Sequence, residues 1–302
     1  MRGCISIATA SSEPEPGVMP DASAVERLLK RDRAIAIVGV ATLAALAWLY
    51  ILAGAGLGMT AWEMTTLAAF PHNAVRMASD MAGMDMSDMM MAPLAWAPVT
   101  WALMIAMWWV MMIAMMAPSA APTILLYAKV HRQAQARGEF QEMLVPTGAF
   151  AAGYLTIWLA FAVAATALHW ALEHAGLVSA MMMGSQSRWL SGAVLIMAGI
   201  YQLSPLKRAC LSQCRAPASF LARYWRPRAS GAFRLGALHG AYCVGCCWLL
   251  MALLFVGGVM NLVWIAALAV FVLIEKSLRA GQWVGRGVGV ALIAWGIATL
   301  LV

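Results

Sequence analysis

Residues 98–121 read PVTWALMIAMWWVMMIAMMAPSAA, and no Asp, Glu, Lys, Arg or His interrupts them. An α-helix needs about 20 apolar residues to cross a hydrocarbon core of about 30 Å. Lipid offers no hydrogen-bond partners to an open backbone, so a crossing segment must be helical. The stretch therefore predicts a transmembrane helix and, with the segments below, an all-α polytopic bundle.

Composition extends this interpretation to the whole chain. Of the 302 residues, 63% are hydrophobic and 11% are charged, whereas about a quarter of a soluble domain is charged. Seven segments approach the length of a span: Ala34–Leu57, Pro98–Ala121, Thr147–Trp170, Trp189–Pro205, Gly236–Phe255, Val259–Glu275 and Val284–Val302. We expect about seven spans, with a tight hairpin at Gly257-Gly258. Six spans, with one segment re-entrant, is the alternative.

Positive charge is confined to alternate connections between these segments. The N-terminal tail and the segments 128–146, 206–235 and 275–287 carry 18 of the 20 Lys and Arg residues. Basic loops stay cytoplasmic, so we expect a cytoplasmic N-terminus, an outer C-terminus and a multi-pass protein of a bacterial inner membrane. The net charge of +7 thus reports topology and contact with membrane lipid; we expect no nucleic acid as a partner.

Two regions follow from this map. Residues 1–33 predict a cytoplasmic tail that ends in a short basic surface helix from Asp21 to Arg33, and residues 34–302 predict the transmembrane domain. The outer loop at 77–91 is rich in methionine and contains Met81, Met84 and Met86 among aspartates. Thioethers suit Cu(I), so the loop is a candidate for metal capture. A flexible loop or an adaptable apolar contact surface is the alternative.

The second expected span adds thioethers at helical spacing. Met111 and Met115 form one M-x-x-x-M pair, and Met112 and Met116 form a second, overlapping pair. Residues four apart lie on one face of a helix, so each pair presents two sulfur atoms to one ion. Packing between helices is the alternative. Pro118 and Pro122 predict that this helix kinks or ends near the cytoplasmic side.

A cluster of thiols on the cytoplasmic side is the most informative feature. Cys210 and Cys214 follow the fourth segment, while the fifth carries His239, Cys243, Cys246 and Cys247. At 100° per residue, the histidine and its three cysteines fall within about 100° of arc. Thiolate and imidazole are ligands for Cu(I), the favoured ion, or for zinc. Lys207, Arg208 and Arg215 would favour thiolate over thiol. Thiol redox chemistry and plain packing are the alternatives.

Two further polar groups lie at helix ends. Glu275 and Lys276 close the sixth segment, where the carboxylate would pair with a basic residue or offer an oxygen ligand, and where the pair could equally be an anchor. His169 and Glu173 lie one turn apart near the end of the third segment. We interpret them as a solvated helix end, with an outer metal contact as the alternative.

Three stretches carry a resemblance to a known family. They are Trp109–Pro122, Tyr201–Lys207 continuing to Cys210, Cys214 and Arg215, and His239–Trp248 continuing to Gly257–Asn261 and Glu275-Lys276. With these residues the chain resembles the predicted metal-binding integral membrane proteins of domain of unknown function 2182, from about residue 98 to the C-terminal helix. The resemblance implies membrane metal binding, usually of copper; the tail and the methionine loop lie outside it.

The leading hypothesis is a metal-binding membrane protein that captures, transfers or delivers copper, with a copper protein or copper-enzyme assembly partner. No catalytic residue is assigned, and no nucleotide-binding motif of the G-x-x-x-x-G-K-[ST] type is present. One alternative is a membrane thiol–disulfide oxidoreductase that uses Cys243 and Cys246. Another is a non-catalytic assembly subunit. The sequence does not fix the oligomeric state.

Overall fold

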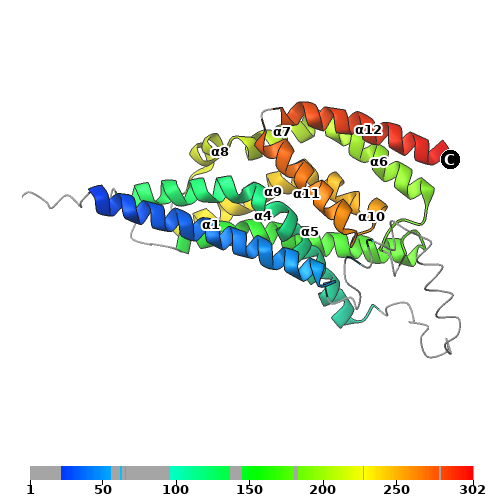
Figure 1. The fold of residues 1–302 in the computed structure, drawn as a ribbon, viewed down its shortest axis with the longest axis horizontal. Coiled ribbons are helices and arrows are strands. Elements are labelled where there is room, and N and C mark those ends of the chain that lie inside the picture. Colours follow the sequence, from blue (N-terminus) through cyan, green and yellow to red (C-terminus); the bar gives the residue numbers. More distant parts are fainter. Residues whose placement is uncertain are drawn as a thin grey trace, which may run out of the picture.

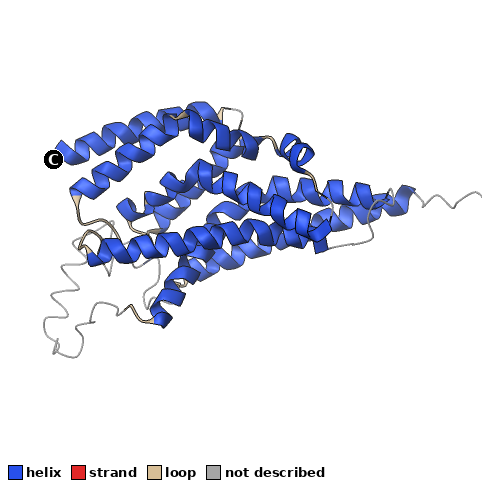
Figure 2. Cartoon of the chain, turned by 180° about the vertical axis from the view of Figure 1, so that it is seen from behind, coloured by secondary structure: helices blue, strands red, loops and turns tan. Residues whose placement is uncertain are grey.

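The computed structural model describes residues 22–55, 62, 65, 96–136, 145–179, 183–226, 228–278 and 280–301. This part of the chain is helical, and its one β-type pairing is an isolated bridge between Val178 and Ser185. The helices form an elongated bundle, seen from two opposite sides in Figures 1 and 2. The expected all-α fold is confirmed.

The helices keep the labels of Figure 1. They are α1 (Ala22–Leu52), α4 (Pro98–Ala136), α5 (Val145–His174), α6 (Arg188–Leu203), α7 (Pro205–Arg215), α8 (Pro217–Tyr224), α9 (Arg228–Ala252), α10 (Leu254–Gly257), α11 (Leu262–Ser277) and α12 (Gly281–Leu301). Helix α4 lies between α1 and α5, α5 packs along α9, and α6 pairs with α12. The chain breaks at Gly257-Gly258 as expected, and Gly258 has a φ of 91°, which favours glycine.

Four helical segments of the described chain are long and apolar enough to cross a membrane: Pro98–Gln135, Thr147–His174, Arg228–Gly257 and Gly281–Leu301. A fifth results if α6 and α7, bent by 64° at their junction, count as one span. The described apolar part of α1, Ile37–Leu52, is shorter. Helix α1 begins at the end of the molecule opposite the C-terminus (Figure 1), as an odd number of crossings requires. The count of seven and the cytoplasmic N-terminus stay predictions.

Two helices run further than expected. The predicted surface helix at Asp21–Arg33 is not separate, because α1 continues without a break from Ala22 to Leu52. Helix α4 does not end at its prolines and continues past Pro118 and Pro122 to Ala136. Prolines are tolerated within helices of a membrane bundle, where packing against neighbouring helices supports the backbone. Close to Pro118, the hydroxyls of Ser119 and Tyr154 both donate to the Met116 carbonyl oxygen, at 2.9 and 3.4 Å, and the second bond links α4 to α5.

Glycines let two helix pairs approach backbone to backbone. A Cβ atom at Gly153 of α5 would collide with the Phe233 carbonyl oxygen of α9, and one at Gly236 of α9 would collide with the Phe150 carbonyl oxygen of α5. Small residues at such crossings allow the dispersion contacts that hold membrane helices together, since lipid supplies no hydrophobic drive between them. Helices α6 and α12 also approach each other closely at glycines. Four glycines meet there in antiparallel register, namely Gly192 with Gly296 and Gly199 with Gly289.

A buried polar triad ties the α6–α7 junction to the end of α11. The Lys207 ammonium donates to Glu275 Oε2 at 2.7 Å and to Gln202 Oε1 at 2.5 Å, and Gln202 Nε2 donates to Glu275 Oε1 at 2.8 Å. All three side chains are buried. The junction itself is capped by Ser204, whose hydroxyl accepts from the Lys207 amide. Glu275 therefore pairs with a basic residue, one of the two roles expected for it.

Replacing Gly153 or Gly236 by alanine should destabilise the bundle. The added methyl group meets a backbone oxygen that cannot rotate away, so we expect the free energy of unfolding to fall by about 1–3 kcal/mol or more. Gly148→Ala is the matched control on α5, because nothing lies within 4 Å of its ideal Cβ position. Denaturant unfolding of the detergent-solubilised protein measures the difference. Equal stability of all three variants would contradict the packing argument.

Removing one charge of the triad should lower the free energy of unfolding more than removing both charges. Lys207→Met leaves the Glu275 carboxylate buried without its cation, which costs about 3–5 kcal/mol. The charge-free double variant Lys207→Met with Glu275→Gln should recover most of that loss. The same unfolding measurement compares the two. A double variant no more stable than the single one would show that the pair is not held by complementary charge.

Candidate metal centre

Helix α9 buries the histidine and all three cysteines that were expected to share one of its faces. His239, Cys243, Cys246 and Cys247 are each at most 2% exposed. The thiols of Cys246 and Cys247 donate to the Cys243 backbone carbonyl at 3.1 and 2.9 Å. Such bonding back to the preceding turn is typical of short polar side chains in membrane helices. The Cys243 sulfur is left to face the neighbouring helices.

Helix α7 brings a further thiol to this face. The 64° bend at the α6–α7 junction lays α7 against α9. Cys214, in the last turn of α7, then lies close enough to Cys243 and Cys246 of α9 for their side chains to interact. Cys210, one turn earlier, packs beside Gly245, with its sulfur 3.1 Å from the ideal Cβ position there. The expected convergence of the two cysteine motifs therefore involves Cys214 directly, and Cys210 at the edge.

Helix α4 adds a thioether. The side chains of Met111, Met112, Met115 and Met116 are all buried, at no more than 1% exposure. Of these, Met116 approaches the thiols, with its Sδ 3.9 Å from Cys247 Sγ. Two sulfur types from two different helices thus meet at one point. Each methionine pair was expected to present two sulfur atoms to one ion, and this stays a prediction. Met116 is the member of the second pair that contacts a thiol.

The cation beside the thiols comes from a residue that the sequence did not single out for this role. Lys276 of α11 donates to Cys243 Sγ at 3.0 Å and to Ser119 Oγ at 3.2 Å, and its Nζ is 4.0 Å from Met116 Sδ. Tyr154 of α5 completes the surroundings, with its hydroxyl 3.2 Å from Cys243 Sγ. An ammonium next to a thiol favours its anionic form, which is the metal-binding form.

Two of the three basic residues expected in that role, Lys207 and Arg215, are engaged elsewhere. The ammonium of Lys207 is taken up by Glu275 and Gln202. The guanidinium of Arg215 donates to the Leu278 carbonyl oxygen at 2.7 Å. For Lys207 the physical reason is the bend at Ser204-Pro205, which brings the first turn of α7 to Glu275 of α11.

His239 occupies an aromatic environment next to the sulfur cluster. Its ring packs against Phe150, Tyr154 and Phe220, with ring centroids 5.3–6.1 Å apart. Its Nδ1 has no hydrogen-bond partner within the described chain. A buried imidazole nitrogen without a partner is costly. Tyr154 contacts both the His239 ring and Cys243 Sγ, so His239 lies next to the sulfur cluster. Its role as a ligand stays a prediction.

The sulfur contacts are pairwise rather than a closed cage. Among the residues that the structure describes, no three or more His, Cys, Asp or Glu side chains are arranged so that they could hold a metal ion. A structural zinc site needs four such ligands in a tetrahedron. The donors present are soft thiols and a thioether, which is the chemistry that suits Cu(I). The residues therefore fit a sulfur-bound monovalent ion better than a zinc cage.

Two other predicted regions have different outcomes. The outer methionines Met81, Met84 and Met86 lie outside the described residues.

His169 is not part of a solvated helix end, because its ring is fully buried and neither ring nitrogen has a hydrogen-bond partner in the described part. Glu173 accepts from Trp96 Nε1 at 3.2 Å. Aromatic packing explains the burial, since Trp96 and Phe255 both lie against the imidazole.

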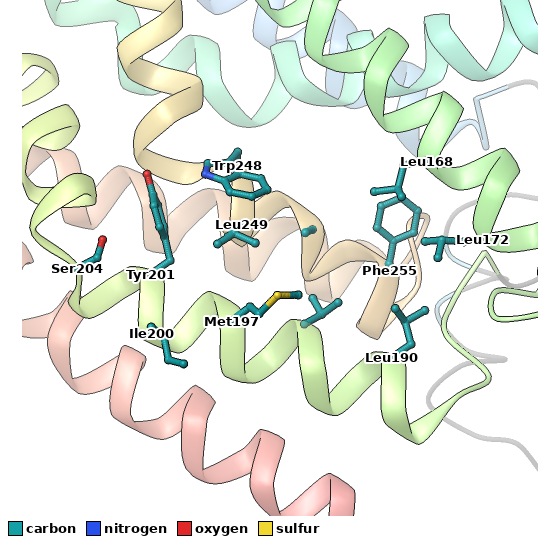
Figure 3. A pocket seen from close by; sticks show the side chains of 12 residues that line it. Leu168, Leu172, Leu190, Met197, Ile200, Tyr201, Ser204, Trp248, Leu249 and Phe255 are labelled. Carbon is teal, nitrogen blue, oxygen red and sulfur yellow. The ribbon is translucent and has the colours of Figure 1, made fainter.

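An apolar cavity of about 480 Å³ lies apart from the sulfur cluster, between α6 and the helices α5, α9 and α10. Figure 3 shows Met197 and Ile200 of α6 on one side, and Leu168 of α5 and Phe255 of α10 on the other. It is lined by apolar surface and contains no thiol or imidazole, so it does not resemble a metal site.

Comparisons with known proteins connect the chain with copper. No curated protein and no solved structure matches the chain. A family model described as a copper chaperone, PpoB2, matches residues 105–299, about two thirds of the chain. The matched region includes the cysteines of α7 and α9, Met116 and Lys276. A copper-related family was expected, and the match gives it this description rather than the name domain of unknown function 2182. The chain therefore belongs to the PpoB2 copper chaperone family.

Proposed function

We propose that this chain is a membrane copper carrier that holds Cu(I) at the junction of α4, α7 and α9 and passes it to a copper protein. The observation that carries the proposal is the meeting of soft donors from two helices, since Met116 Sδ of α4 lies 3.9 Å from Cys247 Sγ of α9 and the Lys276 ammonium contacts both Met116 and Cys243. Helix α7 packs against the same helix α9 and brings Cys214 to it. Thiolate from α7, thiolate from α9 and thioether from α4 form the ligand set. Cys210, Cys247 and His239 are further candidate donors.

The choice of Cu(I) over zinc follows from the donors. Thiolates and thioethers are soft ligands that select Cu(I), and copper handling is the description of the family to which the chain belongs. The charge pattern predicts a cytoplasmic location for this end of the helices. Thiols stay reduced in the cytoplasm, so the donors there remain available for a metal.

The buried methionines of α4 extend the ligand set away from the thiols. Met104, Met107, Met111 and Met115 follow one another at helical spacing and are all buried inside the bundle. A soft ion can move between such donors by ligand exchange, without covalent chemistry. With the outer methionine loop as the capture segment, the ion would travel inward along α4 to the thiols. A copper-enzyme partner would then receive it.

The thiol–disulfide alternative rests on the same two cysteines, Cys243 and Cys246. No disulfide joins them in the structure, and the thiol of Cys246 donates to the Cys243 carbonyl rather than to its sulfur. This arrangement supports metal binding more than disulfide formation. A mixed disulfide formed without bound copper would distinguish the redox function.

Replacing Cys243 and Cys246 by serine should remove copper from the protein. A hydroxyl is a hard donor, so we expect copper per protein chain to fall by about tenfold or more. Detergent-purified full-length protein is loaded with Cu(I) under reducing conditions, washed and measured by elemental analysis. Cys4→Ser, which changes a cysteine of the N-terminal tail, is the control and should keep its copper.

Other results separate the remaining functions. Wild-type protein that binds no copper but traps a thiol partner as a mixed disulfide would indicate the oxidoreductase. Copper binding that is the same in wild-type protein and in the double serine variant would refute the proposed ligands. Absence of both copper and mixed disulfides would favour a role as an assembly subunit.

Met116→Leu should weaken Cu(I) binding while the bundle stays intact. Leucine keeps the apolar volume but lacks the sulfur donor, so we expect the dissociation constant to rise by about tenfold. Competition with a chromogenic Cu(I) chelator measures it. Met260→Leu is the matched control, because Met260 is equally buried but belongs to the turn after Gly258. An equal change in both variants would argue that the loss reflects packing.

A further inference from the structure

Lys276 places a positive charge inside the sulfur cluster. Its side chain is 8% exposed, and its ammonium contacts Cys243 Sγ at 3.0 Å, Ser119 Oγ at 3.2 Å and Met116 Sδ at 4.0 Å. Two of these three atoms belong to the proposed copper ligands. A buried ammonium is stable only with a compensating anion. The atom that can supply this anion here is the Cys243 sulfur.

The carboxylate next to Lys276 in the sequence does not serve it. Glu275 is turned about 100° around α11 from Lys276 and is held by Lys207 at 2.7 Å and Gln202 at 2.8 Å. Consecutive residues of one helix thus point into two separate polar clusters. The triad fixes the end of α11, and this keeps the Lys276 ammonium in register with the thiols.

We propose that Lys276 determines the charge of the cation that the sulfur cluster accepts, so that the cluster takes a monovalent soft ion and disfavours a divalent one. This inference rests on the proposed copper function and adds a specificity-determining residue to it. Lys276 does not ligate the metal, since an ammonium has no free electron pair. It acts through the charge balance of a buried site.

The charge balance gives the direction of the effect. Two thiolates, the Lys276 ammonium and one Cu(I) sum to zero. The same groups with Zn²⁺ leave one uncompensated positive charge, which a water-poor interior disfavours. Without the ammonium, two thiolates and Zn²⁺ are neutral, while the Cu(I) site carries a net negative charge. Removing the lysine charge should therefore shift preference from copper toward zinc.

The test compares three full-length, detergent-purified proteins: wild type, Lys276→Met and Lys276→Arg. Each is equilibrated under reducing conditions with buffered Cu(I) and Zn²⁺ together, and bound copper and zinc are measured by elemental analysis. We expect the ratio of copper to zinc to fall by about tenfold or more in Lys276→Met. Arginine keeps the charge, so Lys276→Arg should retain the wild-type ratio within about threefold.

Several outcomes would overturn the inference. An unchanged ratio in Lys276→Met shows that the charge does not select the ion. An equal loss of selectivity in the methionine and arginine variants shows that shape, and not charge, is responsible. If Lys276→Met does not yield folded protein, Lys276→Gln carries the same test, because its amide is neutral and can still hydrogen-bond to Ser119.

The failure of this inference is distinguishable from failure of the proposed function. Wild-type protein that binds neither metal overturns the copper function itself, and the inference with it. Wild-type protein that binds Cu(I), with a Lys276→Met variant of unchanged selectivity, leaves the copper function standing and removes only the role of Lys276.

Discussion

The backbone contact between α5 and α9 is the constraint on which the site depends. At Gly153 and Gly236 the two helices lie too close for any side chain between them. The residue after Gly153 is Tyr154, and the close approach delivers its hydroxyl to Cys243 Sγ on α9 and to the Met116 carbonyl on α4. A wider spacing between α5 and α9 would separate these three helices at the point where their functional side chains meet.

The bend at Ser204-Pro205 is the second determinant, because it turns one apolar segment into two elements with different tasks. Helix α6 stays in the glycine-mediated pair with α12, while α7 crosses over α9 and carries Cys214 to the cluster. The bend leaves backbone groups at the two helix ends without partners inside a helix, and the Ser204 hydroxyl accepts from one of them, the Lys207 amide. The Lys207–Glu275–Gln202 triad ties the same junction to α11. Fold and site are thus built from the same few residues around one helix break.

Much of this could be predicted from the sequence, since periodicity and composition report local structure. The helical class, the break at Gly257-Gly258 and the burial of Cys243, Cys246 and Cys247 follow from residues close together in the chain. Contacts between distant segments do not. Lys276 meets Cys243 across 33 residues and Met116 across 160, and no spacing rule connects them. For His169 the sequence prediction was wrong. Its position near a helix end predicted a solvent-exposed ring, but Trp96 and Phe255 lie against the ring and bury it.

On the seven-span prediction, in which α11 crosses the membrane, the length of this helix has a consequence for the surrounding bilayer. Its 16 residues rise only about 24 Å, less than a hydrocarbon core of about 30 Å. Such hydrophobic mismatch is relieved when the membrane thins locally or when the polar end of the helix stays submerged. Glu275 and Lys276 occupy that end, and both are enclosed by protein rather than by acyl chains. On that prediction, a short helix with a protein-shielded ionic end lets charge reside below the headgroup layer without contact with lipid.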